Sequence, residues 1–352
     1  MDPKGAARAI DALRRGWPIE VRADDGAYRL MAIEGADDVT TATFDPDGTA
    51  ALLISSARAE TLKLTNQRAA ADPEIPVLVE RAPWIDRNLA MAIADPVRDL
   101  ASPLKGPFRA APLVSPQAAR WALHLARLAG ILPAYFVAGP GPVDVRVEAQ
   151  DIAAYDDATR LAIATRARLP VAASEDAEIV AFRSPEEPRE HIALIVGKRD
   201  SSPPVVRLHS ECLTGDVLGS LKCDCGPQLH EALAQIAAGQ WGVLLYLRQE
   251  GRGIGLVNKL RAYAMQDQGF DTVDANTRLG FAVDARDFSV AARMLDLLGI
   301  HDIRLLTNNP KKIAGLEQAG VKVIERLPLA ILANPHNAHY LVTKRDRTGH
   351  QL

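Results

Sequence analysis

Apolar and polar positions in the first half of the chain repeat with periods that alternate between helix and strand. Residues 5–15 carry apolar side chains three and four positions apart, which predicts a short amphipathic helix, and a strand follows at 18–22. Alternating runs near 28–33 and 50–54 predict two more strands, with a turn at 45–48 between them. This stretch therefore predicts a small α+β arrangement.

A capped helix and a run of breakers predict the rest of this half. Ser115 is a good N-cap for a helix over 116–129, because a proline follows it and a glycine stands directly after the helix. The Gly-Pro-Gly-Pro stretch at 139–142 predicts a loop inside the same domain. A second helix is predicted over about 150–166, and we place a domain boundary after residue 168.

The second half alternates more regularly between predicted strands and helices. Strands are predicted at 204–209, 242–248, 303–307 and 321–324, and helices at 226–237, 256–268 and 308–320. Such alternation is typical of an α/β layer in which part of the sheet pairs in parallel. We therefore predict an α/β protein, α+β overall, with two domains.

Composition and charge exclude several classes of partner. The 352 residues suit two domains, and 48% hydrophobic and 24% charged residues are typical of a soluble globular protein. The net charge of −3 provides no basic field, so we expect no nucleic-acid partner. The N-terminus lacks a signal-peptide pattern and no apolar run is long enough to span a bilayer, so we expect no membrane and a cytoplasmic protein.

The strongest chemical signal is a cluster of cysteines. All three cysteines of the chain, Cys212, Cys223 and Cys225, fall within one stretch of fourteen residues. Three thiolates can hold zinc and leave one coordination position open, as in catalytic zinc sites, and an odd number argues against a disulfide framework. The alternative is that three buried structural thiols merely cluster, but the flanking Asp224 and Gly226 are poorly suited to a core.

Two loops offer places for an anion. The loop at 248–255 (RQEGRGIG) sets two arginines and several glycines before a helix, and the turn at 307–312 (TNNPKK) sets two lysines at a helix start. Helix N-termini, backbone N–H groups and arginines bind phosphate, whereas lysines there are unfavourable unless an anion is present. An ordinary turn and solvated charges remain the alternatives for both loops.

Three further residues stand out from their surroundings. Asp287 is expected to cap a helix that begins near Phe288, whereas Asp284 and Arg286 have no evident capping role. Tyr263 lies within the predicted helix after the glycine-rich loop. Its pattern alone favours a half-buried core tyrosine.

Several ordered motifs resemble those of the GTP cyclohydrolase II family, from about residue 169 to the end of the chain. They are 207–216 (RLHSECLTGD), 220–226 (SLKCDCG), 248–255, 258–263 (NKLRAY), 279–281 (LGF), 284–288 (DARDF) and 305–312 (LLTNNPKK). The resemblance implies a catalytic domain over 169–352 with a mixed sheet and flanking helices. It also implies an enzyme that opens the purine ring of GTP as the first step of riboflavin biosynthesis.

The resemblance assigns the cysteine cluster to a catalytic Zn²⁺, held by Cys212, Cys223 and Cys225, one ion per subunit. The metal lowers the pKa of its bound water, so that hydroxide attacks the purine at C8 near neutral pH. A second hydrolytic step releases formate, and pyrophosphate is lost with the help of Mg²⁺ on the triphosphate. Tyr263 becomes an active-site residue, against the core interpretation.

The resemblance further implies that Arg286 is a nucleophile toward the α-phosphorus and that Asp284 accepts a proton. Because a guanidinium group is almost always protonated, we hold open the alternative that Arg286 chiefly stabilises phosphoryl charge.

Contacts with GTP are also expected by this residue-by-residue comparison. The expected contact residues are Arg207, Leu208, His209, Ser210, Glu211, Gln228, Glu250, Gly251, Arg252, Thr272, Thr307 and Lys312. Arg252 and Lys312 are expected to hold the triphosphate, and Gln228 and Glu250 to contact polar groups of the base.

The first half resembles the 3,4-dihydroxy-2-butanone-4-phosphate synthase family, which is commonly fused ahead of the cyclohydrolase. Two signatures are missing: residues 23–30 read ADDGAYRL where an acidic metal-binding loop is expected, and 114–117 read VSPQ where Gly-His-Thr is expected. We therefore expect residues 1–168 to form a degenerate, non-catalytic domain with a structural or dimer-supporting role. By analogy with the family, a homodimer is expected.

Two other functions stay open on sequence grounds. A paralogue could open GTP in another pathway, such as pyrimidine catabolism, or stop at a formamido intermediate without releasing formate. A regulatory nucleotide-binding protein with a structural zinc is the other alternative, which the presence of Asp284, Arg286 and Tyr263 disfavours.

Overall fold

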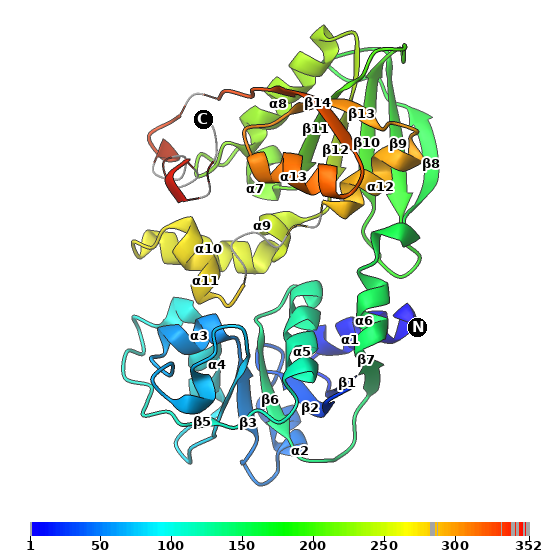
Figure 1. Ribbon diagram of the computed structural model, residues 1–352. Coiled ribbons are helices and arrows are strands. Elements are labelled where there is room, and N and C mark those ends of the chain that lie inside the picture. The colour runs from blue at the N-terminus through cyan, green and yellow to red at the C-terminus, as the bar shows by residue number, and fades with distance from the viewer. Residues whose placement is uncertain are drawn as a thin grey trace. The chain divides into compact units, whose positions relative to one another are not determined.

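The chain folds into two compact units. The computed structural model describes residues 2–281, 286, 288–331, 333–338, 342, 345–347 and 349. The first unit comprises Met1–Asp156 and Ile254–Ala285, and the second comprises Asp157–Gly253 and Arg286–Leu352. Within the described residues each unit holds one seven-stranded sheet with helices packed on it, so the predicted α/β class with two domains is confirmed (Figure 1).

The sheet of the first unit is mostly antiparallel. Its strands run in the order β5-β4-β3-β6-β2-β1-β7. The strands are β1 (Ile19–Ala23), β2 (Gly26–Ala32), β3 (Ala51–Ile54), β4 (Val77–Val79), β5 (Ala110–Ala111), β6 (Ala134–Ala138) and β7 (Val145–Glu148). β1 and β7 pair in parallel, and the other neighbours pair antiparallel.

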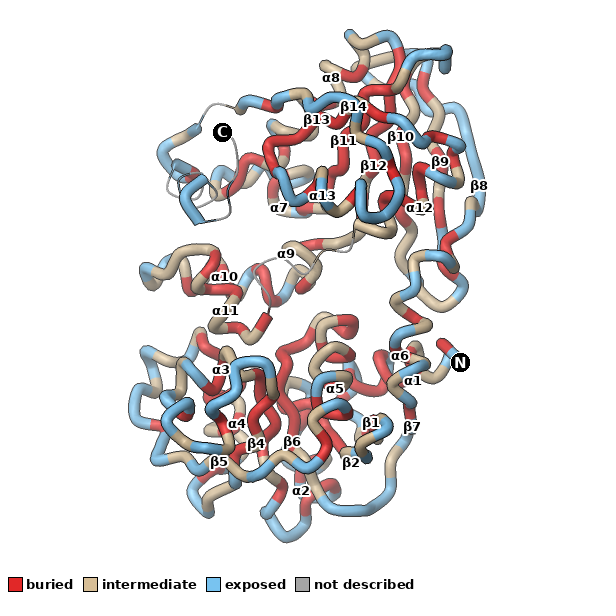
Figure 2. Tube along the Cα trace, viewed as in Figure 1, coloured by how far each residue is buried: buried red, intermediate tan, exposed pale blue. Residues whose placement is uncertain are grey.

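Helices cover both faces of this sheet. They are α1 (Pro3–Arg14), α2 (Asp38–Phe44), α3 (Ser56–Thr61), α4 (Arg87–Ala94), α5 (Pro116–Ala129), α6 (Ala149–Tyr155), α10 (Leu256–Asp267) and α11 (Thr272–Arg278), with short 3₁₀ turns at Arg68–Ala70 and Pro96–Arg98. Because successive strand residues point to opposite faces, Leu53 packs with α1 and α5, whereas Leu52 packs with α3, α4, α10 and α11. The buried strands between these two layers are visible in Figure 2.

The sheet of the second unit is mixed. Its strands run in the order β14-β13-β11-β12-β10-β9-β8. The strands are β8 (Ala162–Arg168), β9 (Ala177–Arg183), β10 (His191–Gly197), β11 (Val205–Ser210), β12 (Trp241–Leu247), β13 (Asp302–Leu306) and β14 (Lys322–Leu327). β11 pairs in parallel with β12 and β13, and β13 with β14, as predicted for part of this sheet. β8, β9, β10 and β12 pair antiparallel.

Helices also cover both faces of the second sheet. They are α7 (Leu213–Asp216), α8 (Cys225–Ala238), α9 (Glu250–Gly253), α12 (Ser289–Leu297) and α13 (Pro310–Gln318), with a 3₁₀ turn at Ala158–Arg160. α8 packs on one face, through Ala232 and Ile236. α12 and α13 pack on the other face, where Leu295 and Leu316 lie in one core cluster.

Most predicted elements are confirmed, and one is wrong. The predicted helix over 150–166 ends at Tyr155, and Ala162–Arg168 is a strand instead. The predicted turn at 45–48 is confirmed, and α2, which was not predicted, precedes it. Ser115 stands at the N-cap of α5 as predicted, but its side chain makes no capping hydrogen bond. The Asp25 carboxylate does this instead, since it accepts hydrogen bonds from the amides of Gln117 at 2.6 Å and Ala118 at 3.2 Å.

The predicted boundary between 1–168 and 169–352 stays a prediction. β8 lies before that boundary in sequence but belongs to the sheet of the second unit. Residues 254–281 lie after it and pack in the core of the first unit. Among the described residues, we find no helix with the length and apolarity that crossing a membrane requires.

Candidate functional site

The cysteine cluster forms where β11 and α8 of the second unit meet. Cys212 directly precedes α7, Cys223 lies two residues before α8, and Cys225 is the first residue of α8. Their three Sγ atoms lie within 4.8 Å of one another, and those of Cys212 and Cys223 are 3.7 Å apart. Sulfurs at such separations suit a single tetrahedral ion.

Two glycines make room for this convergence. A Cβ atom on Gly215 would lie 2.8 Å from Sγ of Cys223 and 3.1 Å from Sγ of Cys212. A Cβ on Gly226 would lie 2.3 Å from the carbonyl oxygen of Gly215, so α7 and α8 approach each other closely only because both positions lack a side chain. The sulfurs therefore border a space that any larger residue at 215 would fill.

The surroundings of Cys223 and Cys225 favour the protonated form of these thiols. The hydrogen bond with Cys212 is the largest cause of a raised pKa in both Cys223 and Cys225, and burial raises these pKa values further. A divalent ion reverses this preference, because it stabilises the thiolate form of each ligand. The start of α8 adds the positive end of a helix dipole at Cys225. The residues present thus fit a soft divalent metal such as zinc.

Asp216 connects the first cysteine to the sheet. Its Oδ2 accepts hydrogen bonds from the amide of Cys212 at 3.0 Å and from the hydroxyl of Tyr246 at 2.9 Å. Nε2 of His209 lies 3.0 Å from Oδ1 of the same carboxylate. The His209 and Tyr246 rings stack with centroids 5.6 Å apart, as expected for neighbours in the parallel register of β11 and β12.

His209 is neutral and has one ring nitrogen available. Burial is the largest cause of its lowered pKa, although Asp216 opposes this effect. An ionised carboxylate only accepts hydrogen bonds, so Nε2 carries the proton and Nδ1 is left as an acceptor. Nδ1 is buried without a hydrogen-bond partner among the described residues, which suits it to accept a bond from a ligand.

Arg207 is buried between β13 and α8. Its guanidinium donates to the carbonyl of Leu306 at 3.0 Å and to Oε1 of Gln228 at 2.5 Å, and Gln228 donates in turn to Asp224 at 2.6 Å. The pKa of Arg207 is lowered to about 10, chiefly by burial and in smaller part by the charge of Arg286, while the charges of Asp224 and Cys225 oppose this effect. Arg207 therefore stays positively charged at neutral pH.

Arg286 adds a second guanidinium near Arg207, as its effect on that pKa shows. Its Cζ lies 5.6 Å from the ring centroid of Phe288, a partly buried residue that packs against the core ahead of α12. Asp284, predicted as a proton acceptor, and Asp287, predicted as a cap, lie outside the described residues. Phe288 stands at the N-cap of α12 and makes no side-chain cap.

The glycine-rich loop is held against the cysteine loop. Oε2 of Glu250 accepts a hydrogen bond from the amide of Leu213 at 2.8 Å, next to Cys212. Gly251 and Arg252 both adopt left-handed backbone conformations, with φ of 62° and 61°. For a residue other than glycine this conformation is uncommon and costs free energy, so the surrounding loop must stabilise it at Arg252.

Thr307 and Lys312 lie at the end of β13 and in the first turn of α13. The Thr307 hydroxyl accepts a hydrogen bond from the amide of Asn309 at 3.1 Å, and Asn309 caps α13. Nζ of Lys312 donates to the carbonyl of Leu208 on β11 at 2.7 Å, and the residue is 6% exposed. The buried ammonium of Lys312 is thus bound to β11, the strand that carries His209.

Other expected GTP contacts in the second unit surround the same strand end. Leu208 and Ser210 lie on β11, and Glu211 follows with an ion pair to Arg248 at 3.0 Å. Burial raises the pKa of Glu211.

Tyr263 and Thr272 belong to the first unit. Tyr263 is half-buried on α10, with Nζ of Lys259 5.7 Å from its ring centroid. Thr272 begins α11 and its hydroxyl accepts a hydrogen bond from Gln266 at 3.0 Å. Half-burial fits either interpretation of Tyr263, so its catalytic role stays a prediction.

Sequence reasoning missed Gly215, Asp216 and Tyr246. The first two lie inside the motif at 207–216 that carries the resemblance, and their spacing from Cys212 was the available signal. Tyr246 is a polar-tipped residue in an otherwise apolar strand, and only the pairing of β12 with β11 reveals its neighbour.

Comparison with known proteins identifies the family. The GTP cyclohydrolase II profile matches residues 162–328. A GTP cyclohydrolase-2 from Azospirillum brasilense is 41% identical over 371 residues, which cover 99% of this chain and 95% of the relative. Relatives of the same name from Proteus mirabilis and from Escherichia coli O45:K1 are 58% and 57% identical over 175 residues, covering 49% of this chain and 88% and 89% of theirs. This chain belongs to the GTP cyclohydrolase II family.

Among solved structures, the chain is similar to a two-domain 3,4-dihydroxy-2-butanone 4-phosphate synthase from A. baumannii. The sequence identity is 16% and the TM-score 0.30, over 93% of this chain and 99% of the other. A TM-score of this size carries no weight for either half, so the likeness of the first half to the synthases stays a prediction. The predicted family of the second half and the hydrolase class are confirmed.

Proposed function

We propose that this protein hydrolyses GTP in a zinc-dependent reaction to 2,5-diamino-6-ribosylamino-4(3H)-pyrimidinone 5′-phosphate, formate and pyrophosphate, as the first step of riboflavin biosynthesis. One observation carries the proposal: the Sγ atoms of Cys212, Cys223 and Cys225 lie within 4.8 Å of one another in a chain of the GTP cyclohydrolase II family. Three protein ligands leave one position of a tetrahedral site for water or substrate.

The metal site supplies the hydrolytic chemistry. Zinc, when bound, provides the Lewis acidity that makes hydroxide available near neutral pH for attack at C8 of the purine. Cys212 is held for this role by Asp216, which fixes its backbone amide at 3.0 Å. One water is consumed in ring opening, one in formate release and one in cleavage of the phosphoanhydride.

The neutral side chains near the cysteines orient the base. Nδ1 of His209 is a buried acceptor with no hydrogen-bond partner among the described residues, so an N–H group of the guanine satisfies it on binding. Gln228 holds Arg207 and Asp224 at the same place and contacts the base from α8. Tyr263, at the zinc site in the family, would exchange a proton with the hydrated C8.

The positive groups act on the triphosphate. The charge of Arg286 lowers the pKa of Arg207, so the two guanidinium groups repel each other. A bound phosphate anion relieves this repulsion. We propose that Arg286 stabilises the charge that develops at the α-phosphorus as pyrophosphate leaves, with Mg²⁺ neutralising the leaving group. The alternative is a bond from Arg286 nitrogen to phosphorus that water later cleaves. Substitution of Arg286 by lysine, with trapping for a covalent adduct, separates the two.

The first half, expected over residues 1–168, is proposed to be non-catalytic. Where the synthase family carries its acidic metal loop, Asp25 caps α5 through the amides of Gln117 and Ala118. A carboxylate engaged in capping is a poor metal ligand. Family resemblance further supports a catalytic domain over 169–352 and a cytoplasmic homodimer.

Incubation of the purified chain with GTP, Zn²⁺ and Mg²⁺, followed by mass spectrometry of the products, tests the proposal. We expect formate and pyrophosphate in equal amounts, together with the pyrimidine product. Loss of GTP without formate would indicate the formamido-forming paralogue. Binding of GTP without turnover would indicate a regulatory protein, and either result contradicts the proposal.

A further inference from the structure

Residues 254–281, which we call the α10–α11 segment, pack in the core of the first unit although they follow the cysteines in sequence. Their apolar side chains share one buried cluster with residues of β3, β6, α3 and α4. The segment contributes Ile254, Ala262, Met265, Ala275, Leu279 and Phe281 to this cluster. Burial of this many apolar side chains makes the segment part of the folded first unit.

Polar contacts anchor the start of the segment. Arg261 donates from Nη2 to Oε1 of Glu34 at 2.8 Å, and the other oxygen of Glu34 accepts the amide of Leu132 at 2.7 Å. Arg261 also donates to Asn258 at 2.8 Å, and the fully buried Asn258 donates to the carbonyl of Gly130 at 3.3 Å. Glu34 thus links α10 to the loop that leads into β6.

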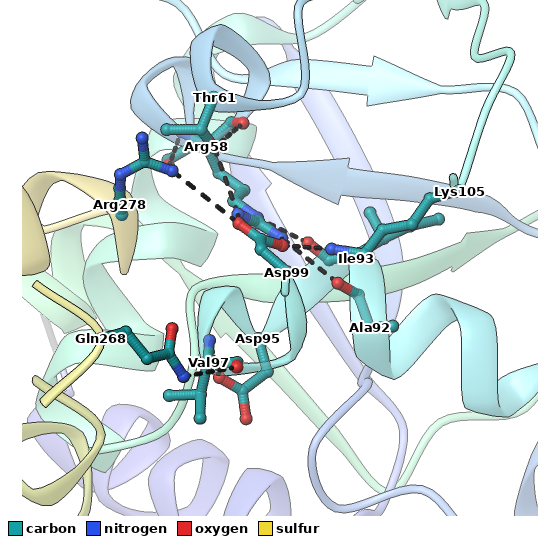
Figure 3. Close-up of polar contacts among 11 residues, drawn as sticks. Arg58, Thr61, Ala92, Ile93, Asp95, Val97, Asp99, Lys105, Gln268 and Arg278 are labelled. Carbon is teal, nitrogen blue, oxygen red and sulfur yellow. Dashed lines mark hydrogen bonds and ion pairs between the residues drawn. The ribbon is translucent and has the colours of Figure 1, made fainter. Parts of the chain in front are cut away.

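A second group of contacts anchors the end of the segment, as Figure 3 shows. Gln268 donates to the carbonyl of Val97 at 3.2 Å, and Nη1 of Arg278 lies 4.0 Å from Oδ2 of Asp99. Asp99 is itself fixed by a bidentate pair with Arg58, at 2.7 Å for each contact, and by Lys105. At this end the segment therefore contacts a carboxylate that two buried side chains, Arg58 and Lys105, already hold.

The Glu34 contact is the most specific of these attachments. The two side chains are only 15% and 21% exposed, and charge-assisted hydrogen bonds at such sites are stronger than those on the surface. Nε of Arg261 also lies 3.5 Å from Asp95 of the first half. Two carboxylates from the first half thus face one guanidinium of α10.

We propose that the first half of this chain is a positioning scaffold for the α10–α11 segment, and that Glu34 is a positioning residue for Tyr263. This inference rests on the proposed function, in which Tyr263 and Thr272 act on GTP. As a scaffold for this segment, the degenerate domain supports catalysis without contacting the substrate.

Glu34→Gln in the full-length chain tests the proposal, because it removes the charge and keeps the shape of the side chain. We expect kcat for formate release to fall about 10-fold or more, while KM for GTP and the zinc content stay close to those of the wild type. Amide hydrogen exchange should become faster across α10 and stay unchanged across α8. Glu60→Gln is the matched control, because Glu60 is exposed on α3, and it should change neither quantity.

A double-mutant cycle with Arg261→Gln decides whether the Glu34–Arg261 contact is responsible. The inference predicts that the double variant loses no more kcat than either single variant. It is overturned if the two losses multiply, or if Glu34→Gln keeps both wild-type kcat and wild-type exchange in α10. A wild-type chain that releases no formate overturns the proposed function instead, and the exchange measurement still decides whether Glu34 anchors α10.

Discussion

The backbone amide of Cys212 donates a 3.0 Å hydrogen bond to the carboxylate of Asp216, four residues later in the chain. This bond closes the turn that orients Sγ of Cys212 toward the sulfurs of Cys223 and Cys225. Because the same carboxylate also accepts a hydrogen bond from Tyr246 and contacts His209, the backbone of Cys212 and the two rings of the sheet are held by one buried group. Loss of a group that orients a metal ligand typically lowers metal affinity or activity about 10- to 100-fold.

Asp216→Asn should therefore weaken the site without removing a ligand. The amide offers one acceptor oxygen where the carboxylate serves three donors, so at least one of Cys212, His209 and Tyr246 loses its partner. We expect zinc affinity or kcat to fall about 10- to 100-fold, measured by competition with a chelator and by formate release. Asp302→Asn, at an exposed position on β13, is the control. Wild-type affinity and rate in Asp216→Asn would contradict this role.

Gly215→Ala should abolish metal binding although residue 215 donates no ligand. The added methyl group would lie 2.8 Å from Sγ of Cys223 and 2.9 Å from Cβ of Cys225, so the sulfurs must separate. We expect less than one tenth of the wild-type zinc content, by elemental analysis of the purified protein. Gly139→Ala, where a Cβ would meet nothing within 4 Å, should retain the metal. Full zinc occupancy in Gly215→Ala would show that the sulfurs converge differently.

Local sequence signals predicted the elements that depend on near neighbours. Periodicity and capping residues identify α5, α8, β11 and β12. Residues 162–166 fall within the stretch predicted as helix, yet they belong to a strand that pairs with β9. Pairing across a sheet overrides intrinsic preference, and a single sequence does not show the partner.

The same distinction between near and distant neighbours in sequence applies to the candidate site. Spacing within 212–225 suffices to predict that the cysteines converge. The contact of Asp216 with Tyr246, thirty residues away, depends on the register of two parallel strands. The attachment of α10 to Glu34 spans 227 residues and has no local signal at all. Hydrophobic periodicity and motif spacing therefore do not predict long-range polar contacts of this kind.

Asp99→Asn should destabilise the first unit. Burial opposes ionisation of Asp99, but hydrogen bonds and charges from Arg58 and Lys105 outweigh it and lower its pKa. The substitution leaves the 3% exposed Arg58 side chain without a countercharge, which we expect to cost about 3 kcal/mol of unfolding free energy. Urea denaturation followed by circular dichroism measures the loss, and Asp47→Asn at an exposed turn is the control. A change below about 0.5 kcal/mol would contradict the structural role of this ion group.

His191 should make the second unit sensitive to acid. Burial, with smaller contributions from Arg189 and Arg248, lowers the pKa of His191 from 6.5 to about 4, and its Nδ1 accepts the amide of Arg248 at 3.1 Å. The unfolded chain takes up a proton on this residue below about pH 6.5, while the folded chain does so only near pH 4. The stabilisation is thus complete above pH 6.5 and is lost as the pH falls toward 4, by about 3 kcal/mol.

Urea midpoints measured between pH 7 and pH 4 test this dependence. His191→Asn keeps an acceptor for the Arg248 amide and removes the titrating group, so its unfolding free energy should fall less steeply over the same range. Equal slopes for the wild type and His191→Asn would show that other groups account for the acid sensitivity.

Removal of the metal tests the central claim most directly. The chain is stripped with a strong chelator until elemental analysis finds no zinc, and formate release from GTP is measured before and after one equivalent of Zn²⁺ per chain is returned. We expect no detectable release from the stripped protein and recovery of the original rate on reconstitution, with Cys223→Ser failing to recover. Stripped protein that converts GTP at the undiminished rate would contradict the account.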